Sequence, residues 1–191
     1  MESARCYGSN RRPVSRAENE VRLNIQRLTT ANMTLRPAIF LDRDGTIIKD
    51  VGYINEPTQV EFYPYTVQAL KALQEHYTLI IITNQSGIAK GNITKEEAET
   101  VNSHIENQLK ENGVTITQTY VCPHSDENNC YCKKPHPFFV LLASVQHHLD
   151  LTRSFMVGDH PSDVECSING GVRPIYLLTG HGEKHREQLR Y

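Results

Sequence analysis

Residues 38–47 read AIFLDRDGTI, and this stretch decides the fold class. Its first four residues are apolar and stop at a charged cluster, which is typical of a buried strand in a parallel sheet. Asp42 and Asp44 are separated by one residue, so both side chains can face the same site as the strand ends. Gly45 permits the tight turn that must follow. The stretch therefore predicts an α/β protein with a site at the carboxyl end of its first strand.

The alternation of strand and helix continues along the chain. Further buried strands are predicted at 79–82, 119–121, 155–157 and 175–178. Helices with one apolar face are predicted at 67–76, 94–112 and 138–149. Thr94 and Glu97 form a capping box at the start of the second helix. This repeated pattern predicts a three-layer, Rossmann-like parallel sheet with right-handed crossovers.

Polar clusters follow four of these strands, at 42–46, 83–87, 122–135 and 158–163. Ligands of open α/β sheets bind at the carboxyl ends of the strands, so the four clusters should converge on one site. Taken singly, each motif is weak, because paired turn aspartates and Gly-Asp helix caps are common. The occurrence of all four clusters, each at the end of a predicted strand, favours a functional site.

The residue types in these clusters suit phosphate chemistry. One carboxylate of the pair Asp42 and Asp44 can attack phosphorus, while the other protonates the leaving oxygen and later activates water. Two carboxylates repel a phosphate, so a cation is needed, and Mg²⁺ accepts carboxylate, phosphate and water oxygens. Asp159 is the natural third carboxylate. Asp163 lies one helical turn farther and could hold a metal-bound water.

Hydroxyl and ammonium groups complete this predicted set. Thr83 or Ser86 can donate a hydroxyl hydrogen bond to the phosphate. Lys134 supplies positive charge where the transition state spreads its negative charge. These residues follow the second and third predicted strands.

A Cys/His segment follows the third predicted strand. Three thiolates and one imidazole make a closed tetrahedral zinc set with a structural role, formed by Cys122, His124, Cys130 and Cys132. The alternative is a group of free cysteines or one disulfide. Cys166 is expected to be a packed thiol. The remaining histidines singled out are expected on the surface or in loops: His136, His147, His148, His181 and His185.

The composition of the 191 residues argues against several other classes of protein. The net charge of −2 implies no nucleic-acid partner, and no apolar run is long enough for a membrane helix. Five cysteines and no secretory signal favour the reducing cytoplasm. Residues 1–34 are expected to be a disordered extension, with a surface helix near 21–28 as the alternative and Met33 as a possible start. Residues 35–191 are expected to be one domain, in a monomer.

The combined motifs resemble the haloacid dehalogenase (HAD) superfamily of phosphatases, and within it the D-glycero-D-manno-heptose 1,7-bisphosphate phosphatases. The resemblance spans about residues 37–182. It rests on AIFLDRDGTI (38–47), GYI (52–54), TNQSGIAKG (83–91), CPH (122–124), CYCKKPHP (130–137) and MVGDHPSD (156–163). It implies a HAD-like fold without a large cap domain, which agrees with the absence of room for an insertion after Asp44 or Gly91.

The resemblance also implies a role for each matching residue. Asp42 would be the nucleophile and Asp44 the proton donor. Mg²⁺ would be held by Asp42, the backbone carbonyl of Asp44, and Asp159. Thr83 and Lys134 would stabilise the transferred phosphoryl group. The substrate-binding residues would be Arg43, Asp50, Val51, Gly52, Tyr53, Asn84, Gln85, Ser86 and Lys133.

The sequence departs from the family pattern at several points. Lys133 stands where the heptose phosphatases have Arg, and Lys cannot grip a second phosphate bidentately. His160 stands where a Lys is common. The short zinc loop also suits histidinol-phosphate phosphatases, whereas Gly52-Tyr53 and GIAKG favour the heptose branch. Relatives usually continue beyond the position of Tyr191 into one more strand and helix.

The resulting prediction is a Mg²⁺-dependent phosphatase acting through an aspartyl-phosphate on a small phosphorylated sugar. The favoured reaction converts D-glycero-D-manno-heptose 1,7-bisphosphate to the 1-phosphate, for surface polysaccharide synthesis. The alternatives are a histidinol-phosphate phosphatase, a broad sugar-phosphate phosphatase, or a phosphosugar-binding regulatory protein without activity.

Overall fold

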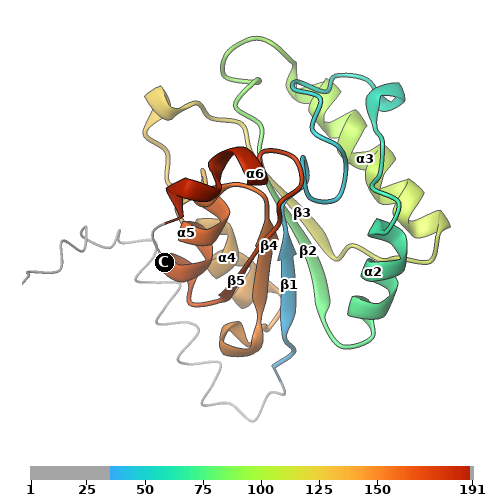
Figure 1. Cartoon of the computed structure of the whole chain (residues 1–191), viewed down its shortest axis with the longest axis vertical. Coiled ribbons are helices and arrows are strands. Elements are labelled where there is room, and N and C mark those ends of the chain that lie inside the picture. Colours follow the sequence, from blue (N-terminus) through green and yellow to red (C-terminus); the bar gives the residue numbers. More distant parts are fainter. Residues whose placement is uncertain (1–34, 190–191) are drawn as a thin grey trace, which may run out of the picture.

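The computed structural model of the chain describes residues 35–189, and five strands in this range form one parallel sheet (Figure 1). The strand order is β3-β2-β1-β4-β5. The strands are β1 (Ala38–Leu41), β2 (Thr78–Asn84), β3 (Gln118–Cys122), β4 (Phe155–Gly158) and β5 (Arg173–Tyr176). The predicted α/β class and parallel sheet are confirmed.

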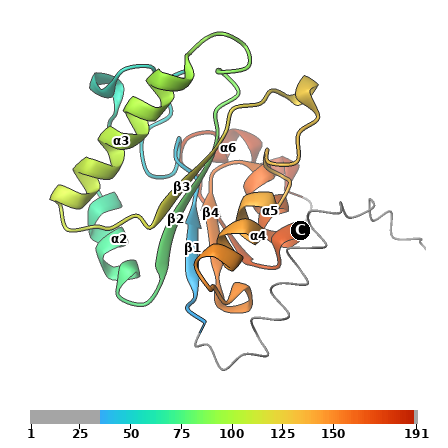
Figure 2. The same cartoon turned by 180° about the vertical axis from the view of Figure 1, so that it is seen from behind.

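Helices cover both faces of the sheet, as Figures 1 and 2 show from opposite sides. One face carries α2 (Thr66–Gln74) and α3 (Lys95–Glu111), and the other carries α4 (Phe138–Gln146) and α5 (Pro161–Gly170). Four single turns of 3-10 helix and the short α6 complete the elements of the described range: η1 (Pro57–Gln59), η2 (Asp126–Asn128), η3 (Leu151–Arg153), η4 (Arg186–Gln188) and α6 (Gly182–His185).

The central strand β1 is buried because helices cover both faces of the sheet and because its two edges pair with β2 and β4. Ile39 lies opposite Leu79 of β2 and opposite Phe155 of β4. Ile39 and Leu41 belong to the core beneath α2 and α3, while Phe40 belongs to the core beneath α4 and α5. The apolar residues before Asp42 therefore pack into the cores on both sides of the sheet, which explains why all four are apolar.

The long helix α3 begins at the capping box expected from the sequence. The Glu97 amide donates to Thr94 Oγ1 at 3.1 Å, and the Thr94 amide donates to the Glu97 carboxylate at 2.6 Å. The helix ends at Glu111 with Asn112 as its C-cap, and Gly113 follows with a positive φ of 76°. Both ends of this helix thus match the sequence prediction.

Several predicted boundaries differ from the structure by a few residues. The last strand runs from Arg173 to Tyr176 instead of covering 175–178, because its partner β4 ends at Gly158, which lies opposite Tyr176. Helix α4 stops at Gln146, since His148 takes a positive φ of 52°. The proposed helix near 21–28 lies outside the described residues.

None of the helices in the range 35–189 is both long and apolar enough to cross a membrane.

Candidate active site

A cavity of about 570 Å³ opens at the carboxyl ends of the strands, and this volume suits a small molecule. Its lining consists of Asp42, Asp44, Asp50, Gly52, Tyr53, Thr83, Asn84, Gln85, Ser86, Asp126, Lys133, Lys134, Pro135, Asp159, His160, Ser162, His181 and His185. The polar clusters that follow the first four strands therefore converge, as the sequence predicts.

Asp42 lies at the end of β1 beside a buried lysine. Lys134 Nζ is 2.7 Å from Asp42 Oδ1 and 2.6 Å from Asp163 Oδ1, and it donates to the Ile82 carbonyl at 3.1 Å. Burial, opposed by Lys134, raises the pKa of Asp42 to about 7. Burial lowers the pKa of Lys134, but Asp163 and Asp42 outweigh it and raise that pKa overall. Lys134 thus remains a fixed positive charge beside Asp42.

Asp44 is held by two donors. Arg43 donates to both Asp44 carboxylate oxygens at 3.0 to 3.2 Å. Gln85 Nε2 donates to Asp44 Oδ2 at 2.9 Å and to Thr83 Oγ1 at 2.8 Å. These bonds fix the carboxylate that could exchange a proton with a leaving group.

The structure places Arg43 and Val51, two of the predicted substrate-binding residues, outside the cavity lining. Arg43 is only 1% exposed and does not line the cavity. Its Nη1 donates to Asn102 on α3 at 2.7 Å, so the side chain positions Asp44 from beneath. Val51 is 57% exposed and is also absent from the lining, because its side chain faces solvent.

Asp159 follows β4 and is held by the C-terminal segment. The His181 amide donates to Asp159 Oδ2 at 2.7 Å. Burial raises the pKa of Asp159 to about 6, and the charge of Asp42 adds to this effect. The Asp159 carboxylate therefore lies close to another negatively charged group, Asp42.

The donor set fits a hard divalent cation. The carboxylate oxygens of Asp42, Asp159 and Asp163 lie within 4.8 Å of one another. Burial is the main cause of a raised pKa in all three, so a bound cation would stabilise their charged forms. Three carboxylates with room for water are the ligands that Mg²⁺ takes in phosphate sites. From the sequence, Asp163 was expected to contact the metal only through a bound water. In the structure its carboxylate lies among the candidate direct ligands.

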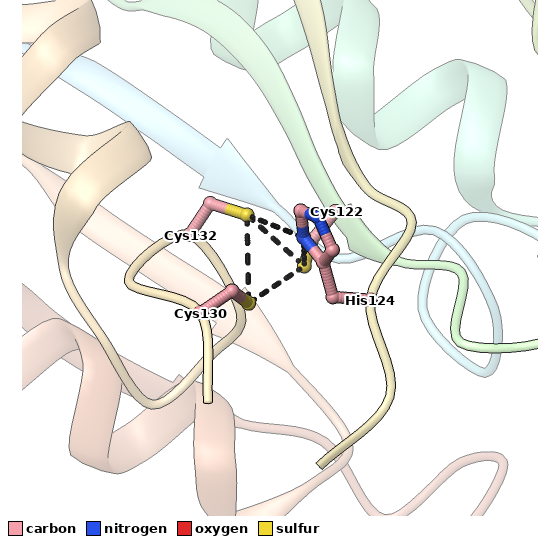
Figure 3. A group of neighbouring side chains, drawn as sticks. All are labelled: Cys122, His124, Cys130 and Cys132. Atoms are coloured by element: carbon pink, nitrogen blue, oxygen red, sulfur yellow. Dashed lines mark hydrogen bonds between the residues drawn. The ribbon is translucent and has the colours of Figure 1, made fainter. Parts of the chain in front are cut away.

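The predicted zinc ligands form a compact cluster beside the cavity (Figure 3). The Sγ atom of Cys122 lies 3.7 Å from that of Cys130 and 3.2 Å from that of Cys132. His124 Nδ1 lies 3.2 Å from Cys132 Sγ and 3.7 Å from Cys122 Sγ. Zn–S bonds of about 2.3 Å in a tetrahedron require sulfur separations of about 3.8 Å. The set therefore fits a closed zinc site.

These cysteines are free of disulfides, as is Cys166. Burial raises the pKa of the Cys122 thiol, so a bound cation is needed to hold it as a thiolate. Cys166 is buried and donates to the His136 carbonyl at 3.4 Å, outside the cluster. The alternative of a disulfide among the described cysteines is thereby removed.

The cavity contains residues that the sequence did not single out for it. Asp126 pairs with Lys133, with 2.5 Å between its Oδ1 and the lysine Nζ. His181 and His185 line the cavity, although they were expected to be surface or loop residues. The sequence did hold one indication of their position, because Gly180 and Gly182 flank His181 after the last strand. Glycines there mark a chain that approaches other backbone closely.

His160 lies on the same wall of the cavity. Its ring centroid is 5.1 Å from that of His185, which is 5.7 Å from that of His181. Burial is the main cause that lowers the pKa of His160 to about 4, and the charge of Lys134 adds to this effect. His160 is therefore neutral near pH 7.

A parallel α/β sheet with a buried Asp–Lys pair, a second fixed aspartate and a three-carboxylate metal site defines an aspartate-dependent phosphatase. Comparison with known proteins gives the same class. The HAD-hydrolase-like family model matches residues 131–190.

Two curated relatives carry the name D-glycero-beta-D-manno-heptose-1,7-bisphosphate 7-phosphatase. The Helicobacter pylori (strain J99) protein is 40% identical over 149 residues, covering 77% of this chain and 86% of the relative. The Escherichia coli K12 protein is 38% identical over 150 residues, covering 74% of this chain and 78% of the relative.

The solved D,D-heptose 1,7-bisphosphate phosphatase of B. bronchiseptica, complexed with magnesium and phosphate, is 28% identical with a TM-score of 0.76. The match covers 81% of this chain and 87% of that one. The chain belongs to the heptose-1,7-bisphosphate phosphatase family of the HAD superfamily.

Proposed function

We propose that this phosphatase removes the 7-phosphate of D-glycero-D-manno-heptose 1,7-bisphosphate and leaves the 1-phosphate in place. The observation that carries the proposal is the pairing of Asp42 with buried Lys134, next to Asp44 held by Arg43 and Gln85. The names of relatives at 38 to 40% identity support the choice of substrate.

In the proposed reaction, Asp42 attacks phosphorus and the bond between phosphorus and the sugar oxygen breaks. The proton of Asp44 passes to that oxygen, so the sugar leaves with a hydroxyl group. Water then gives a proton to Asp44 and attacks phosphorus, which breaks the bond to Asp42 and releases inorganic phosphate. Lys134 and the Thr83 hydroxyl stabilise the transferred group, since both line the cavity.

Mg²⁺, when held by Asp42, Asp159 and Asp163, would supply positive charge that offsets the repulsion between these carboxylates and the phosphate. The predicted contribution of the Asp44 carbonyl to this site stays part of the proposal. The complex of a relative with magnesium and phosphate supports this assignment. Zn²⁺ in the Cys122 cluster would have a structural role, because four protein ligands leave no open position.

The preference for position 7 follows from access and from Lys133. A phosphate on the primary C7 carbon is less hindered than the one on the anomeric carbon. Lys133 lines the cavity and would contact the second phosphate, with the remaining predicted contacts made by Asp50, Gly52, Tyr53, Asn84 and Ser86. Binding energy from that remote phosphate can position the reacting one.

The proposal describes a monomeric enzyme of the cytoplasm. The free thiols of the Cys122 cluster fit a reducing compartment.

The test is a substrate comparison under a single Mg²⁺ condition. Heptose 1,7-bisphosphate should exceed fructose 1,6-bisphosphate and histidinol phosphate in kcat/KM by at least about tenfold. Phosphorus NMR of the product should show the remaining phosphate on C1. A higher kcat/KM for histidinol phosphate would replace the heptose assignment, and similar values for all substrates would indicate a broad sugar phosphatase. An absence of hydrolysis would favour the binding protein.

A further inference from the structure

The segment that follows β5 is fastened to the catalytic end of the sheet. Thr179 Oγ1 donates to the Gly45 carbonyl at 2.5 Å, and the His181 amide donates to Asp159 Oδ2 at 2.7 Å. Tyr176 holds the following turn through a 2.8 Å bond from its hydroxyl to the Gly182 carbonyl. These bonds fix the backbone that carries α6 beside Asp159.

The side chain of His181 extends this connection to the substrate loop. Its Nε2 lies 2.9 Å from Asp50 Oδ2. Asp50 in turn accepts the Gly52 amide at 2.8 Å. The C-terminal segment and the loop at 50–53 are therefore joined across the rim of the cavity, and His185 one turn farther has a defined position on its wall.

Hydrogen bonds also set the proton on two of the wall imidazoles. His185 Nδ1 lies 2.8 Å from Gln188 Nε2, an amide nitrogen that can only donate. His160 Nδ1 accepts the Ser162 amide at 3.2 Å. Because Nδ1 is the acceptor in each ring, the neutral imidazole carries its hydrogen on Nε2. Both residues line the cavity, so its wall offers two N–H donors.

The lysines of the cavity already have carboxylate partners. Lys134 lies between Asp42 and Asp163, and Lys133 contacts Asp126. Neither lysine can grip a second phosphate through two parallel bonds as an arginine does. A second phosphate therefore needs additional donors, and the imidazole wall is placed to supply them.

We propose that His185 is a specificity-determining residue that donates a hydrogen bond from Nε2 to the second phosphate of the substrate, the one that is kept. His160 lies beside it, and His181 holds the segment in place. This inference rests on the proposed function, because only a bisphosphate presents a second phosphate to this wall. The second phosphate would then be bound both by Lys133 and by His185 of α6.

The test compares heptose 1,7-bisphosphate with heptose 7-phosphate in the full chain and three variants. His185→Phe keeps the ring volume and removes both nitrogens, His185→Gln keeps an N–H donor, and His76→Phe makes the same exchange at an exposed histidine outside the cavity. Melting temperatures of all proteins show whether the variants fold.

His185→Phe should raise KM for the bisphosphate about tenfold, as expected for a lost hydrogen bond to a charged group. The kcat/KM for the 7-phosphate, which has no second phosphate, should stay at the wild-type value. His185→Gln should retain most of the preference for the bisphosphate, and His76→Phe should retain all of it.

An unchanged ratio of kcat/KM for the two substrates in His185→Phe would overturn the inference. Equal losses on both substrates would do the same, because they would place His185 against the sugar or in a purely structural role. If the wild-type chain hydrolyses both substrates equally well, this inference fails while the phosphatase reaction stands. If it hydrolyses neither, the proposed function itself fails.

Discussion

Asp159 is enclosed by two glycines that leave no room for a side chain. A Cβ atom at Gly45 or at Gly180 would lie 2.2 Å from Asp159 Oδ2. Both glycines also have positive φ angles, of 76° and 52°. The position of this candidate metal ligand therefore depends on residues from opposite ends of the described chain.

Gly180→Ala should weaken magnesium binding, because the added methyl group must displace the Asp159 carboxylate. The Mg²⁺ concentration for half-maximal activity should rise about tenfold, as for other groups that orient a metal ligand. Gly171→Ala is the matched control, since Gly171 has a similar φ of 77° but no atom within 4 Å of the place where the added Cβ would lie. A Mg²⁺ titration giving equal curves for the two variants would show that the close contact with Asp159 is unimportant.

At this scale the sequence predicted most of the site. The residues Asp42, Thr83, Lys134 and Asp159 were found because each follows a predicted strand, and the parallel strands of one sheet end at the same edge. Arg43 was predicted to bind substrate but lies outside the cavity lining. Its side chain reaches Asn102 on α3 and also contacts the Asp44 carboxylate, which the spacing of the motif alone could not reveal.

The segment from Cys122 to Pro135 lacks a hydrophobic core of its own, so other contacts must stabilise it. Apart from its first residue, which ends β3, and from η2, it has no regular structure, and most of its residues are polar. The cysteine and histidine side chains supply its internal contacts, and Lys133 and Lys134 follow the last of them directly. We therefore expect metal binding to fix the cavity lysines through the backbone.

Cys130→Ser should lose the zinc that we expect in the purified protein, at one ion per chain. Metal binding is coupled to local folding, so hydrogen exchange should become faster across 122–135 and activity should fall indirectly. Cys166→Ala should keep the metal, because that thiol lies outside the cluster. Elemental analysis that finds no zinc in freshly purified, unchelated protein would refute this assignment.

Element boundaries were less predictable than element types. The ends of α3 were predicted because its caps are local, whereas α4 stops early through the backbone conformation of His148. The segment after β5 could not be placed from sequence. Its position depends on bonds to Gly45 and Asp159, which are more than twenty residues away along the chain.

At the scale of the whole molecule, the described range 35–189 holds the five-stranded sheet, the two core clusters and the residues named above as the cavity lining. The division into an extension at 1–34 and a phosphatase domain at 35–191 stays a prediction.

A chain that begins at Met33 should fold and keep the kcat/KM of the full chain, because the sequence before Met33 lacks a core-forming apolar pattern. The measurement is a comparison of thermal unfolding and of steady-state kinetics for the two lengths. A large drop in melting temperature on truncation would show that the first residues pack on the domain after all.

The proposed reaction requires a covalent bond between Asp42 and phosphorus, and rapid acid quenching during turnover, followed by peptide mass spectrometry, would detect it. We expect one phosphoryl group on the peptide that contains Asp42 in the wild-type chain. We expect none in Asp42→Asn, which should fold but lose turnover, because an amide is a far poorer nucleophile. A phosphoryl group on another residue, or turnover by Asp42→Asn near the wild-type rate, would rule out Asp42 as the nucleophile.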